Sequence, residues 1–298
     1  MRHVFQCPMR WADMDLQGHV NNVIYVDYLQ EARVDMLRVH AEREATGELA
    51  EALVVVRHEV HYRAPLTFRF QPVSIECWVT DIRAASFTMA YEVFHADPAQ
   101  VEGRRVYLRA TTVLTPFIFE SERPRRISDG ERSALTSYLE DPPPWADPAR
   151  LSGASRRDKV GHYPVHVRFS DVDVYRHVNN VKYFEYFMEA RILFTARLWK
   201  GLTDEGMPVR MVTARTDVDY KLPILFRPEP YDTWSWLTRV GERSMVIASE
   251  ICDGDRLLAR ARVAMVFVDP VTSRPEAPPP EVRERLLAAP GLIEGVGG

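Results

Sequence analysis

Residues 10–33 read RWADMDLQGHVNNVIYVDYLQEAR, and residues 168–191 read RFSDVDVYRHVNNVKYFEYFMEAR. Thirteen of the 24 aligned positions are identical, at a constant offset of 158 residues. A chain of 298 residues is long for one compact domain and comfortable for two. The repeat therefore predicts two copies of one domain fused in tandem.

The similarity of the two copies sets the expected domain boundaries. Beyond Glu92 the offset falls from 158 to 151, which leaves seven extra residues in the first copy. We expect them in a hairpin turn at residues 95–103, because insertions are tolerated at loop tips. The segment between the copies is rich in proline, glycine and charge, which is typical of a linker. The expected organisation is a first domain, a linker, a second domain and a flexible tail: 1–141, 142–161, 162–290 and 291–298.

Composition and charge exclude several classes of protein. The formal net charge of -4 argues against nucleic-acid binding, which needs a basic face. The three cysteines are widely spaced and suggest neither a disulfide framework nor a thiolate metal site. The first residues lack the apolar run of a signal peptide, and no stretch approaches the roughly 20 apolar residues of a membrane span. We expect a cytoplasmic protein without a membrane partner.

Both copies predict the same order of elements. Each begins with a strand that ends near Trp11 or Phe169, followed by a long helix with a wide apolar face. Four strands and a short helix follow, and an antiparallel sheet wrapped around one central helix explains this α+β order better than a parallel sheet. The expected strands have β-branched and aromatic residues between turn residues: 53–62, 73–82, 87–94, 106–117, 209–220, 231–240, 245–252 and 257–268.

The loop ahead of each helix carries the candidate site. Its polar residues are Asp13, Asp15, His19, Asn21 and Asn22 in the first copy, and Asp171, Asp173, His177, Asn179 and Asn180 in the second. A carboxylate beside unpaired helix amides could act as a general base or nucleophile, with an amide stabilising an oxyanion. The same residues could instead cap the helix and hold the loop. Spacing alone leaves both interpretations open.

Other chemistries fit the sequence less well. The Asp-x-Asp-x3-His pattern offers one nitrogen ligand per copy, so we expect no metal site. Neither a glycine-rich phosphate loop nor a Gly-x-Ser-x-Gly nucleophile elbow is present. The triplets Glu31-Ala32-Arg33 and Glu189-Ala190-Arg191 recur on the helix, where we expect an internal ion pair rather than catalysis.

These motifs resemble the 4-hydroxybenzoyl-CoA thioesterase-like branch of the hot-dog superfamily. The resemblance rests on Asp-x-Asp-x-x-Gly-His-Val-Asn-Asn-x-x-Tyr before a long helix and on a later Tyr-[Arg/Lys]-x-Pro strand, and it spans both repeats. It implies a double hot-dog that acts as an intrachain pseudo-dimer and hydrolyses acyl thioesters. It also implies an acyl chain in an apolar tunnel along the helix.

The resemblance also implies roles for particular residues. The catalytic carboxylates would be Asp15 and Asp173, and the oxyanion amides those of Asn22 and Asn180. His19 and His177 are further candidate catalytic residues in the same loops. The expected substrate-binding residues are Asn21, Asn179, Tyr25, Tyr183, Gly18 and Asp219.

The sequence is also similar to plant-type acyl-ACP thioesterases, which are double hot-dogs with a related motif. Their middle asparagine is replaced here by Gln17 and Tyr175, and their later acid would fall near His61 and Asp219. A further difference separates the two copies, because Arg176 stands where the first copy has Gly18. We therefore expect two related but non-identical sites.

The expected substrate is an acyl-CoA, with acyl-ACP as the nearest alternative carrier. A non-catalytic acyl-binding protein is a third possibility, whereas a hot-dog hydratase is disfavoured because its Asp-x4-His dyad is absent. We expect no cofactor beyond the CoA of the substrate. Further assembly into a homo-oligomer would be compatible with the sequence.

Overall fold

The computed structural model describes residues 1–44, 53–147, 150–200, 202, 209–289 and 292. The chain divides into two compact units, Met1–Pro148 and Ala149–Gly298. In the part of the chain so described, no helix is long and apolar enough to cross a membrane.

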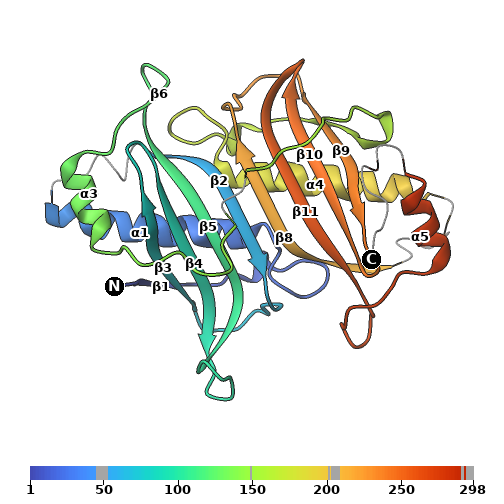
Figure 1. Ribbon diagram of the computed structural model, residues 1–298, viewed down its shortest axis with the longest axis horizontal. Coiled ribbons are helices and arrows are strands. Elements are labelled where there is room, and N and C mark those ends of the chain that lie inside the picture. Colours follow the sequence, from blue (N-terminus) through green and yellow to red (C-terminus); the bar gives the residue numbers. More distant parts are fainter. Residues whose placement is uncertain (45–52, 148–149, 201, 203–208, 290–291, 293–298) are drawn as a thin grey trace. The chain divides into compact units, whose positions relative to one another are not determined.

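Unit 1 is an antiparallel sheet with a long helix. The strands are ordered β1-β3-β4-β5-β2, and every neighbouring pair is antiparallel. Figure 1 shows α1 running along one face of this sheet. The elements are β1 His3–Cys7, the 3-10 helix η1 Trp11–Asp13, α1 Ile24–Glu44, β2 Leu53–Tyr62, β3 Val73–Ile82, β4 Phe87–Ala96, β5 Arg104–Ile118, β6 Arg123–Pro124 and α3 Asp129–Thr136.

Unit 2 repeats this arrangement. Its strands are ordered β7-β9-β10-β11-β8, again antiparallel throughout, and α4 lies along the sheet as α1 does in unit 1 (Figure 1). The elements are η2 Lys159–Gly161, β7 His162–Val165, η3 Phe169–Asp171, α4 Asn180–Leu198, β8 Arg210–Tyr220, β9 Tyr231–Val240, β10 Ser244–Asp253, β11 Arg256–Val268 and α5 Pro280–Leu287.

The eight strands after the helices are confirmed to within about two residues at each end. The first strand of each copy is where the prediction was wrong, because it ends at Cys7 or Val165 and not near the aromatic residue. Pro8 follows β1 and has no N–H to donate to a ladder. Trp11–Asp13 then forms a 3-10 turn. The Asp13 carboxylate at its end accepts hydrogen bonds from the main-chain amide and from the side chain of Arg10, which precedes the turn.

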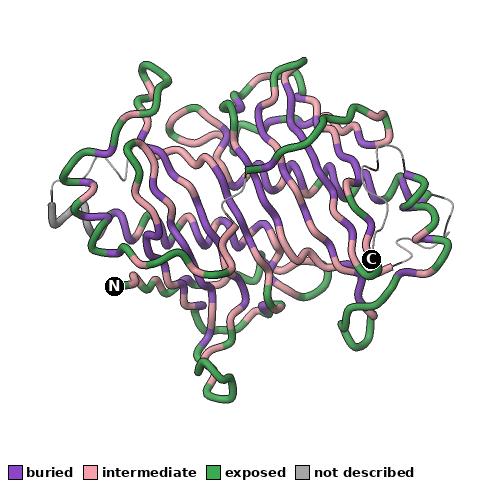
Figure 2. Tube along the Cα trace, viewed as in Figure 1, coloured by how far each residue is buried: buried purple, intermediate pink, exposed green. Residues whose placement is uncertain are grey.

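The apolar face of α1 is buried on the sheet. Leu29, Ala32 and Met36 are at most 1% exposed, at the helical spacing that the sequence indicated. The Cys77 thiol on β3 lies 3.6 Å from the Met36 sulfur, which fixes the helix against that strand. Figure 2 shows the same distribution, with buried residues along strands and helices and exposed residues in the loops.

The register of the β4–β5 hairpin confirms where the first copy is longer. Glu92 pairs with Arg109 in unit 1, and Glu250 pairs with Arg260 in unit 2. Both pairs carry an ion pair between the same side chains. Five of the seven extra residues lie in the turn between Ala96 and Arg104, which has seven residues where the corresponding turn between Asp253 and Arg256 has two. The other two lengthen β4 and β5 by one residue each.

Buried carboxylates fasten the segment expected to be a linker. In unit 1, Glu59 accepts hydrogen bonds from the Asp147 amide at 2.9 and 3.1 Å. In unit 2, Asp219 accepts one from the Leu151 amide at 3.0 Å, and Glu250 accepts one from the Ser155 hydroxyl at 3.0 Å. Each end of the segment is thus bound to its own unit. Most of the expected tail at 291–298 lies outside the described residues.

Candidate functional site

The loop ahead of each helix is closed by main-chain hydrogen bonds. In unit 1 the Asp15 amide donates to the His19 carbonyl at 2.7 Å, and the Gly18 amide donates to the Asp15 carbonyl at 3.0 Å. In unit 2 the Asp173 and Arg176 amides make the equivalent bonds at 2.9 and 3.0 Å. The turn requires one residue in the left-handed backbone conformation, and φ is +76° at Gly18 and +66° at Arg176. The two copies thus share one backbone geometry despite the glycine-to-arginine difference.

The first aspartate of each pair is a buried anchor. Asp13 is 1% exposed and accepts hydrogen bonds from the Arg10 amide at 2.8 Å and the Tyr28 hydroxyl at 2.5 Å. Burial and the hydrogen bond to Asp13 raise the pKa of Tyr28, so the phenol stays a donor. In unit 2 the Tyr186 hydroxyl bonds Asp171 at 2.7 Å. These contacts tie the loop to the helix and leave no access for a substrate.

The second aspartate is placed differently. Asp15 is half-buried, and its Oδ1 accepts hydrogen bonds from the Gln17 amide at 2.8 Å and the His19 amide at 3.3 Å. Among the residues that the structure describes, none donates a hydrogen bond to Oδ2 of Asp15. Asp173 repeats the arrangement, with Oδ1 accepting from the Tyr175 amide at 2.9 Å. Each carboxylate is thus oriented through its Oδ1, and in unit 1 the Oδ2 of Asp15 is left without a donor among the described residues.

The asparagine pairs divide their roles at the helix start. The side chains of Asn21 and Asn179 accept hydrogen bonds from the main-chain amides two residues on, both at 3.0 Å. Asn179 is therefore the N-cap of α4, as the sequence indicated. The Asn22 carbonyl accepts a hydrogen bond from the Tyr62 hydroxyl at 2.8 Å, and Asn180 is held in the same way by Tyr220.

Tyr25 and Tyr183 are buried residues of the helices that follow the two loops, and they support the loops. Both are 3% exposed, and burial raises the pKa of each phenol. The Tyr183 hydroxyl accepts a hydrogen bond from the Ile224 amide at 2.9 Å, and the Ile224 carbonyl in turn binds the Val178 amide at 2.9 Å. Leu66 makes the corresponding carbonyl contact to Val20 in unit 1 at 2.8 Å. These tyrosines thus hold the segments around Leu66 and Ile224, which are hydrogen-bonded to the loops.

The remaining predicted residues lie at different places. His19 and His177 are half-buried at the end of the turn, and their carbonyls close it. Asp219 is 2% exposed and accepts hydrogen bonds from the Leu151 amide and, at 3.3 Å, from Lys221. It therefore helps to fasten the connecting segment, whereas Asp173 lies in the loop before α4.

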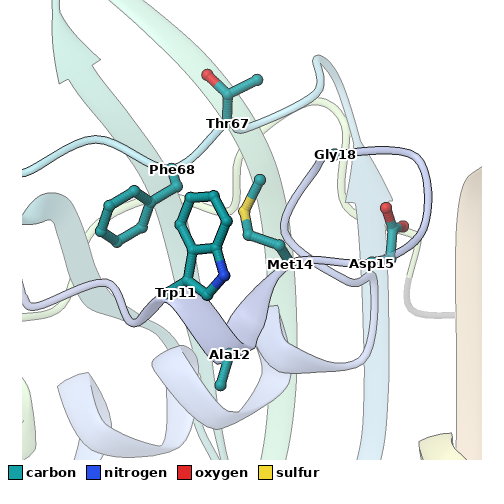
Figure 3. A pocket seen from close by; sticks show the side chains of 7 residues that line it. All are labelled: Trp11, Ala12, Met14, Asp15, Gly18, Thr67 and Phe68. Atoms are coloured by element: carbon teal, nitrogen blue, oxygen red, sulfur yellow. The ribbon is translucent and has the colours of Figure 1, made fainter.

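A cavity of about 550 Å³ opens beside Asp15, and sequence reasoning missed most of its wall. Figure 3 shows Trp11 and Phe68 together on one side of Met14 and the Asp15 carboxylate on the other. The rings of Trp11 and Phe68 meet edge to face, with centroids 5.5 Å apart. The lining residues are Trp11, Ala12, Met14, Asp15, Gly18, Thr67 and Phe68.

Unit 2 carries the same aromatic pair at the same offset. Phe169 and Phe226 replace Trp11 and Phe68, with ring centroids 6.0 Å apart and planes 88° apart. The constant offset of 158 could have identified these four positions, since each pair is aromatic in both copies. Their closeness in space could not be read from the sequence, because the partners lie 57 residues apart.

The Glu-Ala-Arg triplet was expected to contain an ion pair, and that expectation was wrong in unit 1. Glu31 is exposed, whereas Arg33 is 6% exposed and one of its guanidinium nitrogens has no hydrogen-bond partner among the described residues. Neighbouring residues on a helix point in different directions, so positions two apart do not face each other. No group of three or more potential metal ligands is found in the parts of the chain described above.

Comparison with known proteins identifies similar chains. The family described as the thioesterase-like superfamily matches residues 9–136 and again residues 167–286. No curated protein gave a significant match.

Three solved structures share the fold over almost the whole chain. They are a Lactobacillus plantarum protein provisionally named an oleoyl thioesterase (TM-score 0.71, 14% identity, covering 90% of this chain and 97% of that one), an acyl-ACP thioesterase from Bacteroides thetaiotaomicron (0.64, 16%, 89% and 97%) and a 12:0-ACP thioesterase from Umbellularia californica (0.63, 18%, 90% and 97%).

Proposed function

Because the chain belongs to the thioesterase-like superfamily, we propose that it hydrolyses an acyl-CoA to the free acid and CoA, with Asp15 and Asp173 as the reacting carboxylates. The observation that carries this proposal is the contrast within each Asp-x-Asp pair. Asp13 is buried and fully bonded, whereas Asp15 is half-buried, oriented through one oxygen and borders a cavity. Only the second aspartate combines a fixed position with access to a substrate.

The proposed reaction is the addition of water to the thioester carbonyl. The free oxygen of Asp15 takes a proton from water as the water oxygen attacks the carbonyl carbon. Collapse of the tetrahedral intermediate breaks the carbon–sulfur bond, and the proton passes to the leaving thiolate. Direct attack by the carboxylate, through an anhydride that water then hydrolyses, uses the same geometry.

The helix start would stabilise the negative charge that develops on the carbonyl oxygen. The amides of the first turn have no partner within a helix and lie at the positive end of the helix dipole. Asn22 lies just before α1, where the Tyr62 hydroxyl donates a hydrogen bond to its carbonyl and holds the residue in place. We assign the Asn22 amide, and that of Asn180 in unit 2, as the oxyanion donor.

Two alternatives to acyl-CoA hydrolysis differ from it in the carrier of the acyl group or in whether the thioester is hydrolysed at all. Two of the structural neighbours are thioesterases of acyl-ACP, so ACP is the second candidate carrier. Against the plant-type mechanism, the position of its middle asparagine is occupied by Gln17 and Tyr175. A protein that only binds acyl groups is the second alternative. In all three cases we propose that no cofactor is needed beyond the carrier itself.

The test is thiol release by the purified full chain. We expect CoA to be liberated from at least one member of a series of short-, medium-, long-chain and aromatic acyl-CoAs. The same acyl groups on ACP separate the two carriers by their kcat/KM. Release from neither carrier, with acyl-CoA binding retained, would identify a binding protein and reject the enzyme.

A further inference from the structure

We propose that the Trp11–Phe68 pair is the acyl-selecting wall of the Asp15 site, so that the acyl group lies on this open wall and not beneath the helix. This inference rests on the proposed thioester hydrolysis and adds the place and the chemistry of the acyl group. We call Trp11, Phe68 and Phe70 the aromatic wall. The ring centroids of Trp11 and Phe68 are 5.5 Å apart, and those of Phe68 and Phe70 are 5.1 Å apart.

The exposure of the aromatic wall indicates a ligand. Trp11 is 77% exposed and Phe70 is 98% exposed, although large aromatic side chains are usually buried. Trp11 and Phe68 line the same cavity as Asp15, with Met14 between them (Figure 3). A group that reaches past Met14 from the reacting carbonyl therefore meets ring surface.

The chemistry of the aromatic wall favours the acyl group over the carrier arm. Pantetheine has two amides that must keep hydrogen bonds when they leave water. The ring faces and the Met14 thioether offer apolar surface and few strong hydrogen-bond partners. An alkyl chain or an aromatic acyl group gains from covering such a surface, whereas an amide does not.

The interior under α1 is a poor alternative site for the acyl group. Leu29, Met36 and Cys77 fill it and are at most 1% exposed. Polar groups are also buried there, among them His58, whose ring bonds the Thr112 hydroxyl at 2.9 Å. An acyl chain inserted between helix and sheet would displace packed side chains and cover these polar groups, both of which cost free energy.

The second copy has a shorter wall. Phe169 and Phe226 keep the first pair, but Pro228 stands at the position of Phe70. The third ring is therefore specific to unit 1. The Asp15 site should accordingly favour longer acyl groups than the Asp173 site does.

The experiment measures kcat/KM for acetyl-CoA, octanoyl-CoA and dodecanoyl-CoA in an Asp173→Asn background, so that release reports the Asp15 site. Trp11→Ala and Phe68→Ala should each lower the ratio of octanoyl to acetyl kcat/KM by about tenfold. Trp11→Phe should restore most of that ratio. Val101→Ala, which truncates an exposed apolar residue in the β4–β5 turn, should leave the ratio unchanged.

The dependence of kcat/KM on the length of the acyl chain tests the inference independently. Each methylene buried in a closed tunnel is worth about fourfold in kcat/KM, whereas an open wall of three rings gives a plateau. We expect less than about fourfold in total between octanoyl-CoA and dodecanoyl-CoA. A continued rise of about fourfold per methylene would overturn the inference and place the chain in an enclosed tunnel.

The remaining outcomes separate this inference from the proposed function. If Trp11→Ala lowers the acetyl and octanoyl values equally, the ring contacts the carrier and the inference fails while the hydrolase stands. Loss of all release in Asp173→Asn alone would show that the Asp15 cavity is not a working site, which also overturns the inference. Absence of release by the wild-type chain from every acyl thioester would reject both.

Discussion

The Tyr28 hydroxyl donates a hydrogen bond of 2.5 Å to Oδ2 of Asp13, and this contact distinguishes two aspartates that look alike in sequence. Tyr28 lies on α1, fifteen residues after Asp13, and the equivalent pair in unit 2 is Tyr186 and Asp171. The bond draws the first aspartate into the interior and leaves the second at the cavity. The assignment of a catalytic role to Asp15 depends on this division.

Tyr28→Phe should lower the free energy of unfolding by about 1.5–3 kcal/mol, because a hydrogen bond to a buried carboxylate is lost. Tyr186→Phe is the matched variant in unit 2 and should have an effect of similar size. Equilibrium denaturation in urea measures both. A loss below about 0.5 kcal/mol in both variants would mean that the tyrosines do not anchor the loops.

Gly18→Ala should destabilise the protein by about 1 kcal/mol for a conformational reason. The backbone at Gly18 has φ of +76°, and a Cβ placed there meets nothing within 4 Å, so strain and not a clash is the cause. Gly130 on α3 also has open space but no positive φ. Gly130→Ala should therefore stabilise the protein by about 0.5–1 kcal/mol, since alanine is the better helix former. Changes of the same sign in the two variants would contradict this explanation.

The ion pair between buried Glu131 and half-buried Arg125 predicts a pH-dependent contribution to stability. Burial opposes ionisation of Glu131, but hydrogen bonds from Arg125 and Ser128 outweigh it and lower its pKa. A lowered pKa means that the stabilisation is present above the unfolded-state value of about 4.3 and is lost as the pH falls through the folded-state value. Glu131→Gln should thus destabilise the protein near neutral pH and progressively less in acid.

Urea denaturation of wild type and Glu131→Gln at several pH values checks this. The difference in unfolding free energy should be about 1.5–3 kcal/mol near neutral pH and should shrink below about pH 4. Glu120→Gln, at an exposed position nearby, serves as the control and should change little. A difference that stays constant across the pH range would show that the Glu131 carboxylate contributes no charge-dependent stability.

Local patterns predicted most of the secondary structure. The run from Leu53 to Tyr62 is a strand in the structure with the same limits, because its β-branched residues are bounded by turn residues. The N-cap at Asn179 was equally legible, since asparagine there bonds the first turn. Features that depend on the amino-acid type and a fixed spacing are therefore readable from the sequence.

Features that depend on tertiary contacts were not readable. The two aspartates of a pair lie two positions apart in one loop, and the contacts of Asp13 with the Tyr28 hydroxyl and with Arg10 separate them. Likewise, Trp11 and Phe68 come from distant segments, so their common cavity follows from the fold. Arg33 was expected to pair with Glu31, but packing of the helix buries the arginine and leaves the acid in solvent.

The central claim is that the second aspartate of each loop performs the hydrolysis. The most direct test is the rate of thiol release by the Asp15→Asn/Asp173→Asn double variant, with thermal unfolding used to verify that it folds. Removing the reacting carboxylate while keeping the side-chain shape should lower kcat by about a hundredfold or more. Release at the wild-type rate by the folded double variant would contradict the account.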